Sequence, residues 1–205
     1  MIYEFRTYDL KPGSVQEVIK RFGDAYEHRQ KLSKLTAFWY TKIGPLNQII
    51  HVWPYEDAAE RSRIRQEAGT KDYWPPKIAD FIVHQVSEVM VPWSFSPALM
   101  AGDHGPYYEL RSYELVPGML KKMQERWQSN LEKRVELSPL GAVMSVDLGT
   151  VNKIVHVWPY KSLDQRALVR KEAAEKGIWP PKGGGKDFFK QENKILLPAP
   201  FSPMQ

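Results

Sequence analysis

The sequence predicts an α+β protein made of two tandem βαββαβ units that pack sheet against sheet as a pseudo-twofold α/β barrel. Three observations predict this fold. The chain of 205 residues repeats itself at a spacing of 105 residues. Each copy is long enough to form its own layers of helix and sheet. The same polar residues recur on one face of the strands in both copies, and such a face is costly to bury without polar partners.

The repeat rests on three blocks that recur in one order, which indicates a duplicated domain rather than a solenoid. The blocks are Tyr-Glu-Phe-Arg-Thr-Tyr at 3–8 and Tyr-Glu-Leu-Arg-Ser-Tyr at 108–113, Asn-Gln-Ile-Ile-His-Val-Trp-Pro-Tyr at 47–55 and Asn-Lys-Ile-Val-His-Val-Trp-Pro-Tyr at 152–160, and Trp-Pro-Pro-Lys at 74–77 and 179–182. We expect the first repeat over 1–97, a linker over 98–106 and the second repeat over 107–205. A glycine run at 183–185 is expected to form a flexible turn.

The first strand and the first helix of each repeat are predicted by their periodicity. Residues 2–10 alternate in polarity, are rich in Tyr, Phe and Thr, and stop before Pro12-Gly13, which is typical of a strand. An apolar stripe at helical spacing then predicts a helix. The stripe consists of Val15, Val18, Ile19, Phe22 and Tyr26 in the first repeat and of Leu120, Met123, Trp127 and Leu131 in the second.

A hairpin, a second helix and a last strand complete each repeat. Residues 36–43 and 47–53, divided by Gly44-Pro45, predict the hairpin. The second helix begins at a capping box in both repeats. The boxes are Asp57-x-x-Glu60 and Ser162-x-x-Gln165, the helices are expected to end near Gly69 and Gly177, and the last strands are expected at 82–91 and 189–197. The order βαββαβ is that of a ferredoxin-like split βαβ unit.

Strand periodicity divides the repeated residues between two faces of the sheet. Tyr3, Phe5 and Thr7 share one face, and we expect it to pack on the helices together with Ile50 and Val52. The opposite face is polar, and we expect it to point into the space between the two sheets, the barrel lumen. Its residues are Glu4, Arg6, Tyr8, Asn47, His51 and Trp53 in the first repeat and Glu109, Arg111, Tyr113, Asn152, His156 and Trp158 in the second.

This polar face supplies the candidate site residues. In a catalytic site the repeated arginine would hold a carboxylate or an enolate, the repeated histidine would accept a proton, and the repeated tyrosine would orient the substrate. The catalytic candidates are His51, His156, Tyr8 and Tyr113, and the ligand-binding candidates are Glu4, Arg6, Glu109, Arg111, Asn47, Asn152, Trp53 and Trp158. A second interpretation, in which buried Glu–Arg pairs only fix the register of the two halves, is favoured for the glutamates and arginines and equally good for the histidines.

Two further repeated features are interpreted as structural. Arg61 and Arg65 lie one helical turn apart, as do Arg166 and Arg170. Such a pair can hold a carboxylate or phosphate, but it more often belongs to a solvated face. Trp74 and Trp179, each before Pro-Pro, are expected to anchor a loop on the core.

Composition and missing motifs exclude several classes of protein. The absence of cysteine excludes disulfides, thiolate metal sites and a cysteine nucleophile. The net charge is +5, but 29 basic and 24 acidic residues alternate, which favours a solvated surface over a nucleic-acid-binding stripe. Metal, dinucleotide and phosphate-loop spacings are missing, so we expect no metal and no cofactor. The one weak metal candidate is a convergence of His51, His156, Glu4 and Glu109 across the pseudo-twofold axis.

The tandem Tyr-Glu-x-Arg-x-Tyr-x-Leu-x-Pro-Gly and Asn-x-Ile-x-His-Val-Trp-Pro-Tyr blocks resemble those of the NIPSNAP family over essentially the whole chain. The resemblance implies a ferredoxin-like fold of the dimeric α/β-barrel type. That superfamily includes antibiotic-biosynthesis monooxygenases, muconolactone isomerases, haem-degrading enzymes and stress-responsive barrel proteins. The resemblance therefore implies one fold, but it does not single out one function.

We expect this protein to bind a small organic ligand in the barrel lumen, with a cofactor-independent monooxygenase or isomerase as the candidate activity. The alternatives are a non-catalytic scaffold and an RNA-binding module, the latter less favoured because its RNP1 pattern is missing. The expected partner is a small molecule, not a nucleic acid or a membrane. The sequence leaves open whether the chain forms a homo-oligomer. Because no apolar run reaches the roughly 20 residues of a membrane span and the start lacks a targeting leader, we expect a cytoplasmic location.

The two repeats differ beside the polar face. Phe38-Trp39-Tyr40 in the first repeat becomes Val143-Met144-Ser145 in the second. If these side chains line the lumen, the smaller ones open room on the side of the second repeat. We therefore expect His51 and His156 to contribute unequally to ligand binding.

Overall fold

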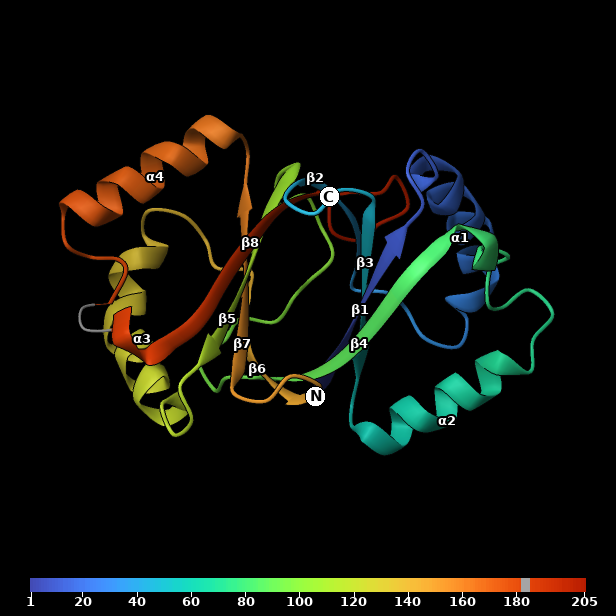
Figure 1. Cartoon of the computed structure of the whole chain (residues 1–205), viewed down its shortest axis with the longest axis horizontal. Helices are drawn as coiled ribbons and strands as arrows, with labels where there is room; N and C mark the ends of the chain where they lie inside the picture. The colour runs from blue at the N-terminus through green and yellow to red at the C-terminus, as the bar shows by residue number, and fades with distance from the viewer. Residues whose placement is uncertain (182–184) are drawn as a thin grey trace.

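Eight strands close into one barrel, and the two helices of each repeat cover the outside of its half of the barrel (Figure 1). The computed structural model describes residues 1–181 and 185–205, so most of the predicted glycine turn lies outside the described residues. The first repeat forms β1 (Ile2–Leu10), α1 (Val15–Arg29), β2 (Ala37–Ile43), β3 (Gln48–Tyr55), α2 (Ala58–Gly69), the 3-10 turn η1 (Ala79–Phe81) and β4 (Ile82–Pro92). The second forms β5 (Tyr107–Leu115), α3 (Leu120–Val135), β6 (Ala142–Leu148), β7 (Lys153–Tyr160), α4 (Leu163–Glu175), η2 (Gly185–Asp187) and β8 (Phe188–Pro198).

The long strands β4 and β8 join the two halves of the barrel. The strand order is β1-β3-β2-β8-β5-β7-β6-β4, and the paired strands are antiparallel. The first part of β4 pairs with β1, and its end, Val89–Pro92, pairs with β6 of the other repeat. In the same way β8 pairs first with β5 and then with β2. The predicted fold, two βαββαβ repeats packed as one barrel, is confirmed.

Local chemistry explains the helix starts and the hairpin turns. Asp57 accepts a hydrogen bond of 2.8 Å from the backbone N–H of Glu60 at the start of α2, as the capping box predicts. Asn47 and Asn152 have φ angles of 58° and 54°, in the left-handed region that Asn tolerates better than most residues. The structure therefore moves both asparagines from the predicted binding face to the turns before β3 and β7.

The lumen of the barrel is filled by apolar side chains. They form one buried cluster to which both repeats contribute. Its larger members are Tyr3, Phe5, Trp39, Ile50, Val52 and Met90 from the first repeat and Tyr108, Leu110, Met144, Val155, Val157 and Leu196 from the second. An eight-stranded barrel has about enough interior for such side chains. The predicted ligand site in the lumen is therefore wrong.

The predicted assignment of the two sheet faces is reversed. Tyr8 and Trp53 pack with Val18 and Phe22 of α1, outside the barrel. The alternation along the strands is as predicted, but both faces are buried, so hydropathy does not say which one the helices cover. The helices that cover the polar face bring arginines, Arg61 and Arg65 of α2, that bind its glutamate.

The ends of the two repeats are exchanged. Phe201, after β8, packs against Phe38 of the first repeat at a ring-centroid distance of 4.8 Å, and Trp93, after β4, packs against Trp127 of the second at 5.5 Å. A Cβ on Gly23 would lie 2.9 Å from the Phe201 ring, so α1 carries a glycine where this ring approaches. Each helical layer is thus completed by the other repeat.

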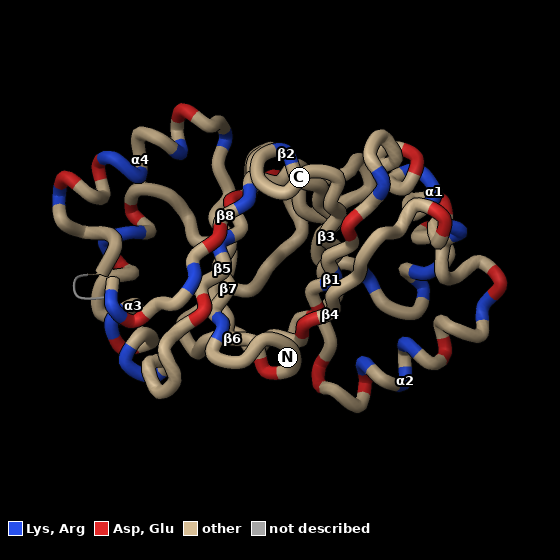
Figure 2. Tube along the Cα trace, viewed as in Figure 1, with Lys and Arg blue, Asp and Glu red and all other residues tan. Residues whose placement is uncertain are grey.

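The outer surface mixes both charge signs. Lys and Arg alternate with Asp and Glu along α1 to α4, as Figure 2 shows. In the ranges 1–181 and 185–205, no helix is long and apolar enough to cross a membrane.

Candidate functional site

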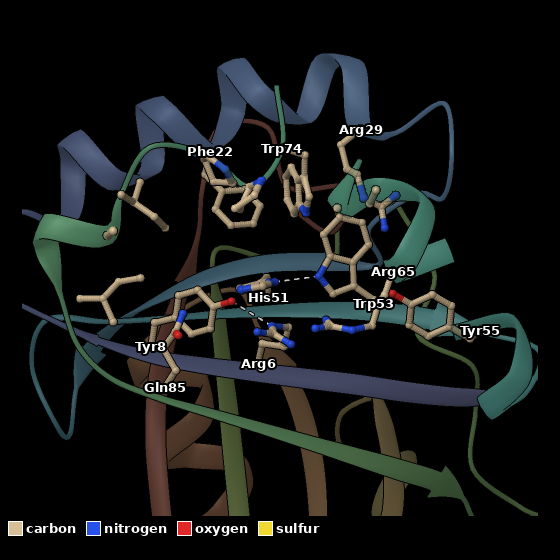
Figure 3. A pocket seen from close by; sticks show the side chains of 17 residues that line it. Arg6, Tyr8, Phe22, Arg29, His51, Trp53, Tyr55, Arg65, Trp74 and Gln85 are labelled. Atoms are coloured by element: carbon tan, nitrogen blue, oxygen red, sulfur yellow. Dashed lines mark hydrogen bonds between the residues drawn. The ribbon is translucent and has the colours of Figure 1, made fainter. Parts of the chain in front are cut away.

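Each repeat contains a cavity between the outer face of its sheet and its helices. The first cavity measures about 410 Å³ and the second about 310 Å³. Figure 3 shows the first, with residues from β1, β3, α1, α2 and the loop before η1 around it. The side chains that shape it are Arg6, Tyr8, Phe22, Arg29, His51, Trp53, Tyr55, Arg65, Trp74 and Gln85. Their counterparts around the second are Arg111, Tyr113, Trp127, Arg134, His156, Arg170, Trp179 and Gln191.

A buried glutamate behind each cavity fixes its arginines. The Glu4 carboxylate is fully buried and accepts hydrogen bonds from Arg61 (2.7 Å), Arg6 (3.0 Å), Arg65 (3.3 Å) and Ser87 (2.6 Å). Burial alone would raise the pKa of Glu4, but the hydrogen bonds from Ser87 and Arg61 and the charges of Arg65 and Arg6 lower it to about 2. Glu4 is therefore an anion that positions arginines and is not itself part of the cavity wall.

The second repeat has the same arrangement. Glu109 is fully buried and accepts hydrogen bonds of 2.6 Å from both Arg111 and Arg166, while Arg170 lies 3.8 Å away. Burial opposes ionisation of Glu109, but the hydrogen bond from Arg166 and the charge of Arg111 bring its pKa to about 2. The helical arginine pairs that the sequence favoured as a solvated face thus bind an internal carboxylate.

A buried arginine that the sequence reasoning missed lines each cavity. Arg29 of α1 is 2 % exposed, and its guanidinium lies 4.6 Å from the centroid of Trp53 and 5.4 Å from that of Trp74. Arg134 lies 4.1 Å from the centroid of Trp158 in the second repeat. The sequence does contain a signal for this pair. Arg29 and Arg134 are 105 residues apart, which is the repeat spacing, and each lies next to the apolar stripe of its helix.

Each cavity contains a histidine whose ring is held by a tryptophan. The indole Nε1–H of Trp53 donates to Nδ1 of His51 at 2.7 Å, and that of Trp158 donates to His156 Nδ1 at the same distance. Burial and the charge of the nearby arginine, Arg6 or Arg111, hold the pKa of each histidine well below its usual value. Both rings are therefore neutral and carry their proton on Nε2.

This tautomer argues against the expected role of the histidines as proton acceptors. The lone pair of Nδ1 is occupied by the indole N–H, and Nε2 already holds a proton. The Nε2 atoms of His51 and His156 are buried and have no hydrogen-bond partner in the described part of the chain. Each Nε2–H is therefore a hydrogen-bond donor without an acceptor among the described residues.

The structure brings most of the predicted site residues together. Arg6 donates through Nε to the Tyr8 hydroxyl at 2.9 Å, and Arg111 donates to Tyr113 in the same way. In the first repeat Arg6, Tyr8, His51 and Trp53 surround one cavity. In the second, Arg111, Tyr113 and His156 do so, whereas Trp158 holds His156 from behind. Trp74 and Trp179, predicted as core anchors, are cavity walls as well.

The predicted convergence of His51, His156, Glu4 and Glu109 on one metal is wrong. Each His–Glu set faces the helices of its own repeat, on opposite sides of the filled lumen. Among the described residues, no group of three or more His, Cys, Asp or Glu side chains could hold a metal ion.

The second cavity is the smaller one, although the second repeat carries the smaller residues Val143-Met144-Ser145 in place of Phe38-Trp39-Tyr40. The expected extra room concerned the lumen, which is filled. Trp39 and Met144 do face the lumen, but Phe38 and Val143 pack on the helix side. There the loss of Phe38 is balanced by α3, which carries Trp127 where α1 carries Phe22.

Comparison with known proteins agrees with this architecture. A family model described as NIPSNAP matches residues 3–97 and 108–203. The human protein NipSnap homolog 3A is 27 % identical over 217 residues, which cover 100 % of this chain and 86 % of that protein.

Two solved structures align over almost the whole chain. A candidate monooxygenase of Fusobacterium nucleatum has a TM-score of 0.69 at 11 % identity, covering 97 % of this chain and 92 % of that chain. A candidate monooxygenase of Lactobacillus acidophilus has a TM-score of 0.67 at 12 % identity, covering 96 % of this chain and 92 % of that chain. At such identities the likeness shows the fold alone.

Proposed function

The chain belongs to the NIPSNAP family, and we propose that it binds small organic anions, one in each cavity between the sheet and the helices. One observation carries the proposal. Three arginines line each cavity, and no carboxylate lines either of them in the described residues. The first cavity has Arg6, Arg29 and Arg65 in its wall.

The charges around the first cavity do not cancel. Glu4 is shared by Arg6, Arg61 and Arg65, and Arg29 has no carboxylate partner among the described residues. One buried and three partly exposed cations around a single carboxylate favour a further anion, because charges interact more strongly where water is partly excluded. A guanidinium group also matches the planar shape of a carboxylate.

The remaining wall indicates an organic ligand with an apolar body. Phe22, Trp53 and Trp74 line the first cavity, and Trp127 and Trp179 line the second. Aromatic walls with a few convergent polar groups, in volumes of about 300 to 1,000 Å³, are typical of small-molecule sites. We therefore favour aromatic carboxylates over inorganic anions.

A second candidate function is cofactor-independent oxygenation or isomerisation of such a ligand. The observation that favours it is that Arg6, Tyr8 and His51 line one cavity and can each present a polar hydrogen, an arrangement that would stabilise an enolate. The two solved structures described as candidate monooxygenases share the fold with this chain.

Calorimetric titration with benzoate tests the binding function, with benzamide as the matched neutral probe. We expect benzoate to bind and benzamide to bind at least about tenfold more weakly, because the guanidinium groups need an anionic partner. Arg65→Gln, at a half-exposed cavity residue, is expected to weaken benzoate binding about fivefold, since solvent screens part of the charge.

Arg63→Gln is the control for the Arg65 variant. Arg63 lies on the same helix, its side chain is exposed and its partner is Glu67 on the same helix. We expect this variant to bind benzoate as the unchanged protein does. Equal binding of benzoate and benzamide, or equal losses in the two variants, contradicts the proposal.

A further inference from the structure

The ring nitrogens of His51 and His156 have a chemistry that the anion-binding function does not use. The indole N–H of tryptophan is a donor only, so the nitrogen facing Trp53 or Trp158 at 2.7 Å must be an acceptor. The proton of each neutral ring is therefore on Nε2. The same pairing occurs in both repeats, which places one fixed N–H donor in each cavity.

This donor has no acceptor in the described protein. His51 and His156 are both 1 % exposed, and both Nε2 atoms are buried without a partner. Around His51, the rings of Tyr8 and Phe22 lie at centroid distances of 4.8 Å and that of Phe38 at 5.8 Å. A buried N–H without an acceptor is unfavourable, and most such groups in proteins are paired.

The donor shares its cavity with the arginines. Arg6 and Arg65 both bind the same oxygen of Glu4, at 3.0 Å and 3.3 Å, so their guanidinium groups lie together. In Figure 3 the guanidinium of Arg65 lies below the Trp53 indole, and His51 lies beside that indole, next to Tyr8. A ligand whose carboxylate meets these arginines therefore has His51 in the wall of the same cavity. There a further oxygen of the ligand meets an N–H group that can bind only an atom with a free lone pair.

We infer that His51 and His156 each donate an Nε2–H hydrogen bond to a second, unprotonated oxygen of the bound anion, so that the ligands are oxo acids or their enolates. This inference rests on the proposed binding of organic anions and narrows its ligand class. Trp53 and Trp158 are positioning residues, because they fix the ring tautomer and do not themselves contact that oxygen.

Two probes of similar shape test the inference. 4-Acetylbenzoate carries a carbonyl oxygen opposite its carboxylate, and 4-isopropylbenzoate replaces that oxygen with a methyl group. We expect the acetyl probe to bind about tenfold more tightly, as one buried hydrogen bond allows. His51→Phe and His156→Phe, which keep an aromatic ring and remove the donor, should abolish this preference in their own cavity while 4-isopropylbenzoate still binds.

Nitrogen NMR of the unchanged protein gives an independent result that does not depend on the folding of a variant. We expect His51 and His156 to carry their proton on Nε2 in the free protein, and the Nε2 signals to shift when 4-acetylbenzoate is added. Trp53→Phe should release the tautomer of His51 and reduce the acetyl preference, whereas His156 stays unchanged.

The possible outcomes distinguish a failure of this inference from a failure of the proposed anion binding. If neither probe binds, the anion-binding function fails and the inference fails with it. If both probes bind with equal affinity, or if the free histidines carry their proton on Nδ1, anion binding stands and the hydrogen-bond donor is wrong. If the acetyl preference survives in both histidine variants, its oxygen is bound elsewhere and the inference is also wrong.

Discussion

Phe188 lies against Tyr113 at a ring-centroid distance of 5.1 Å, in the position beside the second cavity that Ile82 occupies beside the first. Together with Trp127 in place of Phe22, it explains why the second cavity has about 310 Å³ and the first about 410 Å³. The duplicated sites thus share their polar groups but differ in the size of their walls.

Reciprocal substitutions should therefore exchange the size preference. We expect the unchanged protein to bind one 2-naphthoate per chain tightly, in the larger first cavity. Ile82→Phe should weaken this site because the added ring takes part of its volume, and Phe188→Ile should raise the stoichiometry to two. Calorimetric titration measures both effects. Val83→Phe is the control, because Val83 is 66 % exposed beside Ile82, and an unchanged stoichiometry in both test variants contradicts the assignment.

The buried glutamates should control stability at low pH. The pKa of Glu4 and Glu109 in the folded protein is about 2, against an ordinary 4.5. A lowered folded pKa means stability that is fully present above about pH 4.5 and is lost as the pH falls toward 2, about 3 kcal/mol for each glutamate. Urea unfolding between pH 7 and pH 2 measures this loss.

Glu4→Gln should lower the free energy of unfolding at pH 7 by about 3 kcal/mol, because it leaves three arginines without their anion. The variant should also reduce the pH dependence of the free energy of unfolding. Glu17→Gln, at an exposed side chain paired with Arg21 on the same helix, is the control and should change stability by less than about 0.5 kcal/mol. A loss at Glu4 no larger than at Glu17 would mean that the ion cluster contributes nothing.

The repeat spacing and the local motifs predicted the elements because the signals are local. Asp57 and Ser162 cap their helices as their capping boxes indicate, and the stripe from Val18 to Tyr26 faces the sheet. The orientation of the two sheet faces is not determined by local sequence. Tyr3 and Glu4 are both completely buried or nearly so, and only the partners that approach each face distinguish the lumen from the helix side.

The sequence predicted the site residues that lie on strands but not the arginine that α1 contributes to the site. Arg6 and His51 stand out because polar residues alternate with apolar ones along a strand. Arg29 follows Tyr26 on the buried side of α1, and in sequence it looks like the basic last turn of any helix. Its role depends on Trp53 and Trp74, which come from distant segments. Comparing the two repeats position by position, rather than motif by motif, would have shown the Arg29–Arg134 pair.

The exchanged ends should make the two repeats unfold as one unit. Phe201 stacks beside Phe22 and Phe38 of the other repeat, and Trp93 packs on Trp127. Trp93→Ala removes a side chain that is 4 % exposed and should lower the free energy of unfolding by about 3–5 kcal/mol. We expect a single unfolding transition by both far-UV circular dichroism and tryptophan fluorescence, in the variant and in the unchanged protein. Two separate transitions contradict the exchange as the source of cooperativity.

Arg29→Met separates a binding role from a structural one. Methionine fills a similar volume between Trp53 and Trp74 without a charge, and it removes the cost of burying a cation that has no carboxylate partner among the described residues. We therefore expect the free energy of unfolding to change by less than about 1 kcal/mol, while benzoate binding in the first cavity weakens about tenfold because one guanidinium is lost. Urea unfolding and calorimetric titration give the two values for one preparation. If Arg29→Met instead destabilises the fold as strongly as Glu4→Gln and benzoate still binds with unchanged affinity, Arg29 supports the core and the anion is bound by Arg6 and Arg65 alone.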